Sequence, residues 1–187
     1  MKKIILIMLL LFPLSVKADK ISASLSKCVD GDTAKFKVDK KEIKVRFLGI
    51  NTPESVKPNE KAEPLGKEAS KFTCDKLKNA KKIELEYDEA NNTIDMYGRE
   101  LMYVFVDDKL LEEILLKKGY AKVKYIDKSY KYYDKLVRAE KYAINKELGV
   151  YSREIVEKET IDSFISKVAD YISSKVKKIL SNILGNS

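Results

Sequence analysis

The stretch of sequence that decides the fold begins with Asp30-Gly31-Asp32-Thr33 and resumes, after one further strand, with Lys44-Val45-Arg46-Phe47-Leu48-Gly49-Ile50-Asn51-Thr52-Pro53-Glu54. Asp30-Gly31 is a turn signal between two segments rich in strand-forming residues. Residues 33–38 alternate apolar and polar side chains, and so do residues 42–50, which predicts two half-buried strands. Arg46 falls on the polar face of the second strand, and Pro53 ends it.

Polar side chains gather where this pair of strands begins and ends. A hairpin of this length can bring Asp32, Asn51 and Glu54 close to Arg46. Calcium takes carboxylate, amide and carbonyl oxygens, an arginine can hold a phosphodiester, and a further carboxylate can orient or deprotonate water. The pattern therefore predicts a cation-dependent site that acts on phosphate. A solvated hairpin with ordinary surface charges is the alternative, because Asp-Gly is common in hairpins.

Composition removes several kinds of chemistry. The chain has 187 residues, enough for one domain with a substantial core, and it contains no histidine. A catalytic pair of serine or cysteine with histidine is therefore impossible, and two cysteines are too few for an all-cysteine zinc site. Hydrolysis by this chain must rely on carboxylates, tyrosines, lysines, arginines or a hard metal ion.

The remaining pattern predicts an antiparallel α+β domain. Strands are expected at residues 20–29, 33–38, 42–50, 82–88 and 100–106, with an extended segment at 121–126. About three helices are expected, at residues 66–79, 109–118 and 130–148, the last two stopped by Gly119 and Gly149. Five strands with helices between and after them can close into a barrel.

Four motifs occur in a fixed order along the chain. They are Asp30-Gly31-Asp32-Thr33, Arg46 to Glu54, Gly66-Lys67-Glu68-Ala69 and Asp95-Met96-Tyr97-Gly98-Arg99. Together with the spacing between them, these motifs resemble the staphylococcal nuclease (thermonuclease) family from about Ile21 to Arg153. The resemblance implies a five-stranded OB-fold-type β-barrel. That fold also serves proteins that only bind their ligands, so the fold alone does not settle function.

The resemblance implies a calcium site and identifies its ligands. Asp32 matches an acid that binds the ion in the family, and Thr52 matches the residue that offers its backbone carbonyl. Asn51 stands where the type enzyme has an aspartate. An amide keeps an oxygen ligand but removes a negative charge, so weaker calcium binding is expected.

The resemblance also implies three catalytic residues. Arg46 and Arg99 match two arginines that hold the phosphate and stabilise its developing charge, and Glu54 matches the residue that positions or activates water. Tyr97 and Tyr125 can stack on a base or contact phosphate. The chain has 11 tyrosines, however, so a purely structural role for these two is the alternative.

The N-terminus reads as a secretory signal peptide. Lys2 and Lys3 precede an apolar run, and Val16-Lys17-Ala18 has the small residues of a cleavage site. We expect residues 1–18 to be removed and the protein to be periplasmic or extracellular; an uncleaved anchor is the alternative. Subtracting the three lysines of the leader from the formal charge of +8 leaves about +5, which suits a polyanionic partner.

Export permits a disulfide, and Cys28 and Cys74 are the only cysteines. The first falls on a predicted strand and the second on a predicted helix. The sequence alone leaves two readings open, which are a bridge between them or two free, partly buried thiols.

Residues 154–187 form a tail after the nuclease-like domain of residues 19–153. Its apolar residues recur at helical spacing and are Ile161, Phe164, Ile165, Val168, Ile172, Val176, Ile179, Leu180, Ile183 and Leu184. The stripe indicates an amphipathic helix that is straight rather than a strict heptad coil. Such a helix, within residues 155–187, can bind a membrane surface, associate with another copy or pack on its own domain.

The sequence thus predicts an exported, calcium-dependent nuclease. Its expected partners are DNA and RNA, preferably single-stranded, cut with little sequence preference, and the resemblance implies 3′-phosphate products. Two alternatives remain from the sequence. One is an OB-fold module that binds nucleic acid with little catalysis, because Asn51 lacks the charge of an aspartate. The other is a membrane-associated or partner-associated protein that acts through its tail.

Overall fold

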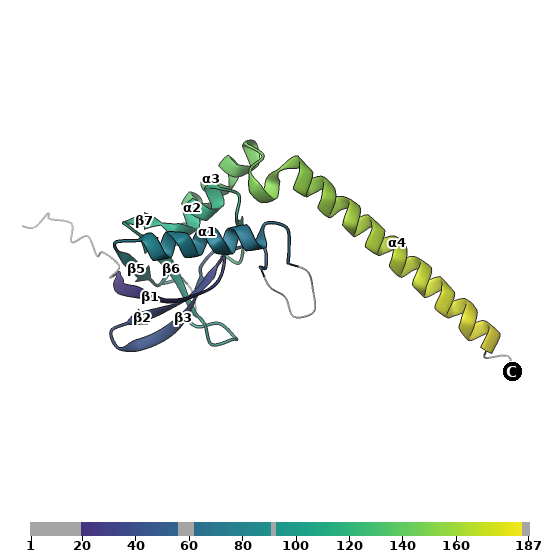
Figure 1. Ribbon diagram of the computed structural model, residues 1–187, viewed down its shortest axis with the longest axis horizontal. Coiled ribbons are helices and arrows are strands. Elements are labelled where there is room, and N and C mark those ends of the chain that lie inside the picture. Colours follow the sequence, from purple (N-terminus) through teal and green to yellow (C-terminus); the bar gives the residue numbers. More distant parts are fainter. Residues whose placement is uncertain (1–19, 56–61, 91–92, 185–187) are drawn as a thin grey trace, which may run out of the picture.

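The computed structural model describes residues 20–55, 62–90 and 93–184 (Figure 1). Five strands of one sheet form its centre and follow the order β3-β2-β1-β5-β6. They are β1 (Ile21–Asp30), β2 (Thr33–Val38), β3 (Lys41–Phe47), β5 (Ile83–Glu86) and β6 (Glu100–Val106). Neighbours in this order are antiparallel.

A parallel pairing of β3 with β6 closes the sheet into a barrel. Val45 lies opposite Glu100, and Phe47 lies opposite Met102. Closure removes the exposed edges that an open sheet would present to other chains. The predicted fold class, a five-stranded OB-fold-type barrel in an α+β protein, is therefore confirmed.

Three further short strands extend this frame. β4 (Ile50–Asn51) pairs with β8 (Lys122–Val123), and β7 (Lys109–Leu110) pairs with the end of β6. The predicted strand 42–50 is thus interrupted after Phe47, because Gly49 has a φ of +83° that turns the backbone. This turn sends Asn51 away from the barrel and towards β8.

The helices lie where the sequence pattern placed them, with small shifts at their ends. They are α1 (Gly66–Asn79), α2 (Leu111–Lys117), α3 (Tyr133–Asn145), the 3₁₀ turn η1 (Gly149–Tyr151) and α4 (Arg153–Leu184). The predicted helix 109–118 begins two residues later, because Lys109 and Leu110 pair with β6 instead. α2 and α3 pack on each other beside the barrel (Figure 1).

The core fills the barrel and the space beneath α2 and α3. Its largest completely buried side chains come mainly from the barrel strands β2, β3, β5 and β6 and from the helices. They include Phe36, Phe47, Leu85, Met102, Tyr103, Leu115, Leu116 and Leu136. Burial of this apolar surface holds β3 and β6 together at the position where the candidate site begins.

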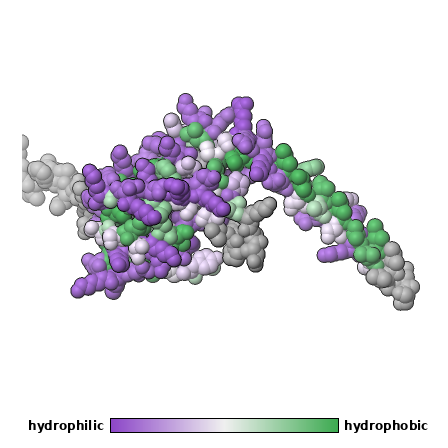
Figure 2. All heavy atoms as spheres, viewed as in Figure 1, coloured by the Kyte–Doolittle hydropathy of each residue, from purple (hydrophilic) through white to green (hydrophobic). Residues whose placement is uncertain are grey.

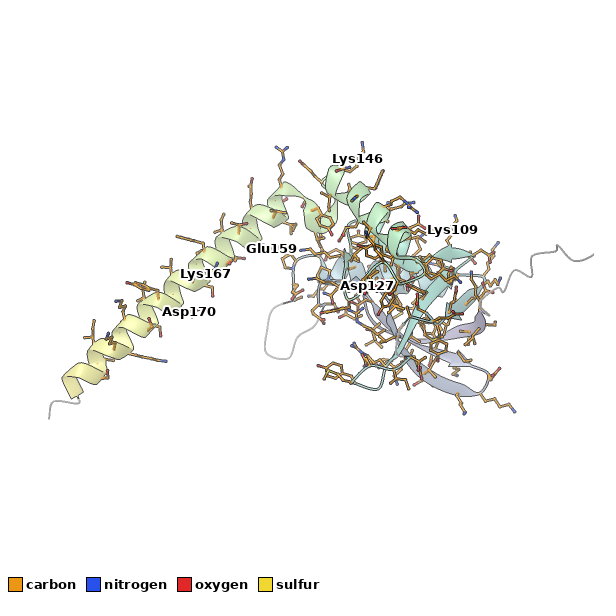
Figure 3. The ribbon with its side chains drawn as sticks, turned by 180° about the vertical axis from the view of Figure 1, so that it is seen from behind. Lys109, Asp127, Lys146, Glu159, Lys167 and Asp170 are labelled. Atoms are coloured by element: carbon orange, nitrogen blue, oxygen red, sulfur yellow. A yellow bond between two sulfur atoms is a disulfide. The ribbon has the colours of Figure 1, made fainter. Side chains whose placement is uncertain are left out.

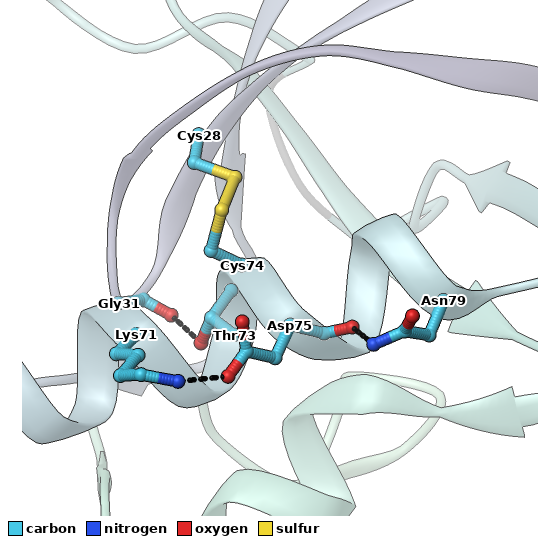
Figure 4. Close-up of a disulfide and its surroundings, with 7 residues drawn as sticks. All are labelled: Cys28, Gly31, Lys71, Thr73, Cys74, Asp75 and Asn79. Carbon is cyan, nitrogen blue, oxygen red and sulfur yellow. Dashed lines mark hydrogen bonds and ion pairs between the residues drawn. A yellow bond between two sulfur atoms is a disulfide. The ribbon is translucent and has the colours of Figure 1, made fainter.

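A disulfide joins Cys28 on β1 to Cys74 on α1, with Cα atoms 5.6 Å apart (Figure 4). The structure therefore contains the bridge that the sequence left open. Next to it, the Thr73 hydroxyl donates a hydrogen bond of 2.6 Å to the carbonyl of Gly31. The disulfide and this hydrogen bond thus attach α1 to β1 and to the turn that leads to Asp32.

Two glycines fix the junction before the last helix. Gly119 and Gly149 both have positive φ angles, 70° and 55°, and the Val150 amide donates to the Gly119 carbonyl. A Cβ on Gly119 would lie 2.1 Å from the Leu148 carbonyl oxygen, and one on Gly149 would lie 2.2 Å from the Gly119 oxygen. Only glycine fits at either position without a backbone shift.

α4 extends away from the barrel (Figure 1), and apolar residues lie along much of its visible face (Figure 2). Its predicted helical structure is observed over Arg153–Leu184. Within residues 20–55, 62–90 and 93–184, no helix is long and apolar enough to cross a membrane. The expected leader, residues 1–18, lies outside the described residues.

Breaking the disulfide should destabilise the barrel without abolishing the fold. The double substitution Cys28→Ser/Cys74→Ser opens a loop closed over a sequence separation of 46. We expect the free energy of unfolding to fall by about 2–4 kcal/mol, because the unfolded chain regains loop entropy. Urea denaturation with and without reductant measures this loss. The wild-type protein in reductant should match the double variant, and equal urea midpoints in all four samples would show that the bridge carries no stability.

Candidate active site

The Arg46 guanidinium is the centre of the polar cluster at the end of β3. Its Nη1 lies 2.9 Å from the Asp32 Oδ2 and donates to the Ile50 carbonyl, also at 2.9 Å, and its Nη2 donates to the Asn51 Oδ1 at 2.9 Å. Arg46 is only 9% exposed. The predicted arginine therefore lies on the polar face of its strand, as expected, but in a buried network that joins the β1–β2 turn to β4.

The Asp32 carboxylate is held by three groups at once. Besides the ion pair with Arg46, its Oδ2 accepts the backbone N–H of Thr52 at 2.9 Å, and its Oδ1 accepts the Thr33 hydroxyl at 3.0 Å. Such charge-assisted bonds compensate the loss of hydration of a buried carboxylate. Asp32 and Thr52 are thus brought together, as the sequence predicted.

A cavity of about 630 Å³ opens beside this cluster. It lies between the β3–β4 segment, the turn before β6 and the chain after β8. Six of the eight predicted site residues line it, namely Arg46, Asn51, Glu54, Tyr97, Arg99 and Tyr125. The other two, Asp32 and Thr52, are buried beside it. The structure therefore brings all eight predicted residues into one region.

Arg99 faces the same cavity as Arg46, but a different partner holds it. The Asp95 Oδ2 accepts its Nε at 2.7 Å, and the Asp95 Oδ1 accepts the backbone N–H groups of Tyr97 and Arg99, both at 2.9 Å. Asp95 thereby builds the turn and aims the arginine. The pKa of Asp95 is lowered despite its partial burial, because these hydrogen bonds favour the carboxylate.

Tyr97 and Tyr125 form two walls of the cavity and are largely exposed, at 76% and 80%. The Arg99 guanidinium lies 5.3 Å from the centre of the Tyr97 ring. Tyr125 has a φ of +63°, in the left-handed region that non-glycine residues rarely adopt. Exposed rings beside two arginines are suited to stack on flat, negatively charged ligands.

Glu54 lines the cavity among other acids. Burial raises the pKa of its carboxyl, and a hydrogen bond with the Asp30 side chain raises that pKa further. The negative charges of Asp32 and Glu63 act in the same direction. Like charges at short range disfavour ionisation of the next carboxyl, so this corner attracts a cation.

The residues predicted to bind calcium fit a hard cation in their chemistry. The Asp32 carboxylate and the Asn51 Oδ1 both reach the Arg46 guanidinium, so they lie close together, and the Asn51 Nδ2 donates to the Thr52 carbonyl at 3.3 Å. All three donors are oxygens, as calcium prefers. Among the described residues, no group of three histidine, cysteine or acidic side chains is arranged to hold a metal ion. The set would therefore carry one protein carboxylate, and water would complete the coordination.

Some functional residues were missed by reasoning from the sequence. Asp95 belongs to one of the recognised motifs, but no role was expected for it. Its position four residues before Arg99 was the signal that could have indicated their ion pair. Thr73 supports the Asp32 turn from a distant helix, and no sequence pattern indicated that contact. Glu63 accepts the Glu54 backbone N–H at 3.0 Å, and no sequence pattern indicated that contact either.

Comparison with known proteins agrees with this geometry. The sequence model of the family described as "Staphylococcal nuclease homologue" matches residues 44–153, and its match ends where α4 begins. The chain is 38% identical to the thermonuclease of Staphylococcus hyicus over 135 residues, which cover 72% of this chain and 78% of that protein.

Two proteins of Bacillus subtilis show a comparable similarity. The chain is 39% identical to endonuclease YncB over 134 residues, 71% of this chain and 63% of that protein. It is 40% identical to the SPbeta prophage-derived endonuclease YokF over 134 residues, 71% of this chain and 45% of that protein. The matches thus span less than two thirds of either Bacillus protein. By its sequence, its barrel and the arrangement of its cavity, the chain belongs to the staphylococcal nuclease family.

Proposed function

We propose that the protein is an exported, calcium-dependent nuclease that cuts DNA and RNA with little sequence preference. Its family makes it a phosphodiester-hydrolysing nuclease. The observation that supports the proposal best is the cavity in which Arg46, Arg99 and Glu54 face a common space beside Asp32. Two guanidinium groups and one carboxylate around a single space are what hydrolysis of a phosphodiester requires.

The two arginines bind the scissile phosphate from different sides. A guanidinium offers two parallel N–H groups to phosphate oxygens, and its charge stabilises the extra negative charge of the transition state. Arg46 is fixed by Asp32 and Asn51, and Arg99 is fixed by Asp95. Because both are held in advance, little reorganisation is needed when the charge develops.

Glu54 orients the attacking water and accepts its proton. The backbone of Glu54 is fixed by two hydrogen bonds with Glu63, one in each direction, both of 3.0 Å. A carboxylate whose pKa is raised above its usual range is a stronger base once it is ionised. Attack on the side opposite the 5′ oxygen would break the P–O5′ bond and leave a 3′-phosphate and a free 5′-hydroxyl, the products that the family resemblance implies.

Asp32, Asn51 and the Thr52 carbonyl would hold calcium. When bound, the ion supplies positive charge that neutralises the phosphate and the surrounding acids. Asn51 removes one negative charge from this set compared with an aspartate. We therefore propose that the protein needs a higher calcium concentration than a relative with aspartate at this position would.

Tyr97 and Tyr125 favour single-stranded substrates. Stacking on a tyrosine requires a base that is no longer stacked on its neighbours. Unstacking a base costs less free energy in a single strand than in a duplex. Their rings are exposed enough to be reached. We place the protein in the periplasm or outside the cell, on the basis of the leader sequence, where the Cys28–Cys74 disulfide would persist.

The direct test of this function is hydrolysis of single-stranded DNA, duplex DNA and RNA by residues 19–187 in calcium, magnesium or chelator. Rapid cleavage in calcium and none in chelator is expected, with the single strands cut faster than the duplex. Binding of DNA without cleavage in calcium would refute the calcium-dependent activity.

Replacing Glu54 by Gln should lower the turnover number by about 10²–10⁴-fold, because the general base is lost. Binding of single-stranded DNA should change little, since a neutral side chain of the same size remains. Glu68→Gln, on an exposed position of α1, is the matched control and should keep full activity. Near-normal turnover of Glu54→Gln would remove Glu54 from the mechanism.

Replacing Arg46 by Lys should impair catalysis severely although the charge is kept. A lysine lacks the planar guanidinium group, whose several N–H groups can bind Asp32, Asn51 and phosphate at the same time. We expect a turnover loss of about 10²-fold or more, and a lower urea midpoint because Asp32 loses its buried partner. Arg138→Lys, on the exposed side of α3, serves as the control. A mild loss in Arg46→Lys would mean that this arginine only supplies charge.

Replacing Asn51 by Asp should tighten calcium binding and lower the calcium concentration for half-maximal activity, because affinity follows ligand charge. Asn51→Ala should raise that concentration. A calcium titration of single-stranded DNA hydrolysis, at fixed salt because phosphate binding is salt-sensitive, gives all three midpoints. A shared midpoint would place Asn51 outside the metal site, and Asp30 would be the next acid to test.

A further inference from the structure

α4 presents an apolar stripe with no partner in the described part of the chain. Its main contact with the rest of the protein is at its start, with η1. Beyond that start, large apolar side chains are about half exposed or more, for example Phe164 at 68%, Ile165 at 58% and Ile179 at 56%. An exposed stripe of this kind normally marks an interaction surface.

The stripe follows a strict repeat. Its central residues are separated by steps of 4, 3 and 4 residues, twice in succession, and are Ile161, Ile165, Val168, Ile172, Val176, Ile179 and, in the sequence, Ile183. Every member is Ile or Val. An 11-residue repeat keeps one side of a helix in line over about 33 Å, and β-branched core residues are typical of helices that pack by knobs into holes. The stripe is thus suited to a second helix of the same kind.

Charge is divided unequally along α4. The first half, residues 154–169, contains Glu154, Glu157, Glu159 and Asp162 against Lys158 and Lys167. The second half, residues 170–184, contains Lys175, Lys177 and Lys178 against Asp170. Figure 3 shows Glu159 nearer the barrel and Asp170 farther along the helix, with Lys167 between them. Two such helices attract each other when they run antiparallel and repel when they run parallel.

The flank beside the stripe repeats this complementarity. Glu157 and Lys175 are 18 residues apart, which is five full helical turns, so both lie on the same side of α4. In an antiparallel pair this flank of one helix faces the same flank of the other. The acidic member of this flank lies in the first half of α4 and the basic member in the second half, so an antiparallel pair brings the acidic part of one flank towards the basic part of the other.

A lipid surface fits these features less well. Interfacial helices place Trp, Phe or Leu in the membrane and Lys or Arg on the polar face. This chain has no tryptophan, the central residues of its stripe are Ile and Val with Phe164 and Leu180 at its sides, and Glu159 and Asp170 lie among the polar positions. The acidic first half would also be repelled by anionic lipids.

We propose that α4 is a self-association element, which pairs with α4 of a second copy of this chain in antiparallel orientation. The paired stripes bury the repeated Ile and Val residues, and the acidic half of each helix faces the basic half of the other. The barrel of each copy then lies at an opposite end of the helix pair, with its cavity open.

Sedimentation equilibrium of residues 19–187, which contain every described element, tests the pairing. At tens of micromolar the protein should have twice the mass of one chain. The double substitution Ile165→Asp/Ile172→Asp should weaken association by about 100-fold or more, because each buried Ile contributes about tenfold or more. Ser163→Asp/Ser174→Asp adds the same charge to the other side of α4 and should leave the mass unchanged.

Charge reversal tests the orientation. Reversing the basic half (Lys175→Glu/Lys177→Glu/Lys178→Glu) or the acidic half (Glu154→Lys/Glu157→Lys/Glu159→Lys) should weaken the pair by about tenfold or more, and the two sets combined in one chain should restore it. In a parallel pair each half of α4 would face the same half of its partner, so reversing one half would leave the pairing unchanged.

Three results would overturn the proposal. One is a monomer at every concentration. Another is a dimer that the paired substitutions at Ile165 and Ile172 leave intact. The third is a monomer that cosediments with vesicles of phosphatidylglycerol and phosphatidylethanolamine, since the stripe would then bind lipid. Nuclease activity should survive in every α4 variant, so loss of association is distinguishable from loss of the barrel.

Discussion

The buried ion pair between Arg46 and Asp32 is the interaction on which the site depends. It brings together the turn before β2 and the end of β3, and the backbone amide of Thr52, twenty residues after Asp32, binds the same carboxylate. Each charge would be costly to bury alone, and together with their hydrogen bonds they compensate one another. The closed barrel makes this possible, because the parallel pairing of β3 with β6 fixes the end of β3. Arg99, at the entry to β6, is thereby brought to the same cavity.

The charged residues of the site form two groups, one with two arginines and one made of acids. Arg46 and Arg99 each bind an aspartate with part of the guanidinium, Asp32 and Asp95 respectively. On the other side Glu54 lies near Asp30 and Glu63, and burial together with these acids raises its pKa. Under the proposed function, a phosphate would bind the two arginines, and the acids around Glu54 would help to attract the cation proposed to bind at Asp32. Such separation stabilises two charged ligands of opposite sign next to each other.

The sequence predicted the barrel and the helices, because periodicity and turn residues act locally, and the order of the motifs named the eight candidate residues that the structure brings into one region. It could not predict contacts between distant segments, such as the Thr73 hydroxyl on Gly31 or the disulfide beside it. Glu112 shows a further limit. It reads as a surface acid at the start of α2, yet it is completely buried and accepts the Val104 amide. Burial raises its pKa well above the usual value, and only the packing of α2 on β6 reveals this.

The contact between Gly119 and Gly149 has a consequence for how this protein can evolve. A Cβ on either glycine would collide with backbone atoms of the other segment, so neither position can accept a larger residue unless that backbone moves. Drift at one position therefore requires a compensating backbone change at the other, thirty residues away. Because α4 begins shortly after Gly149, the contact between the two glycines sets the direction in which that helix leaves the domain. The exit angle of the tail is thus constrained by two residues that lie outside it.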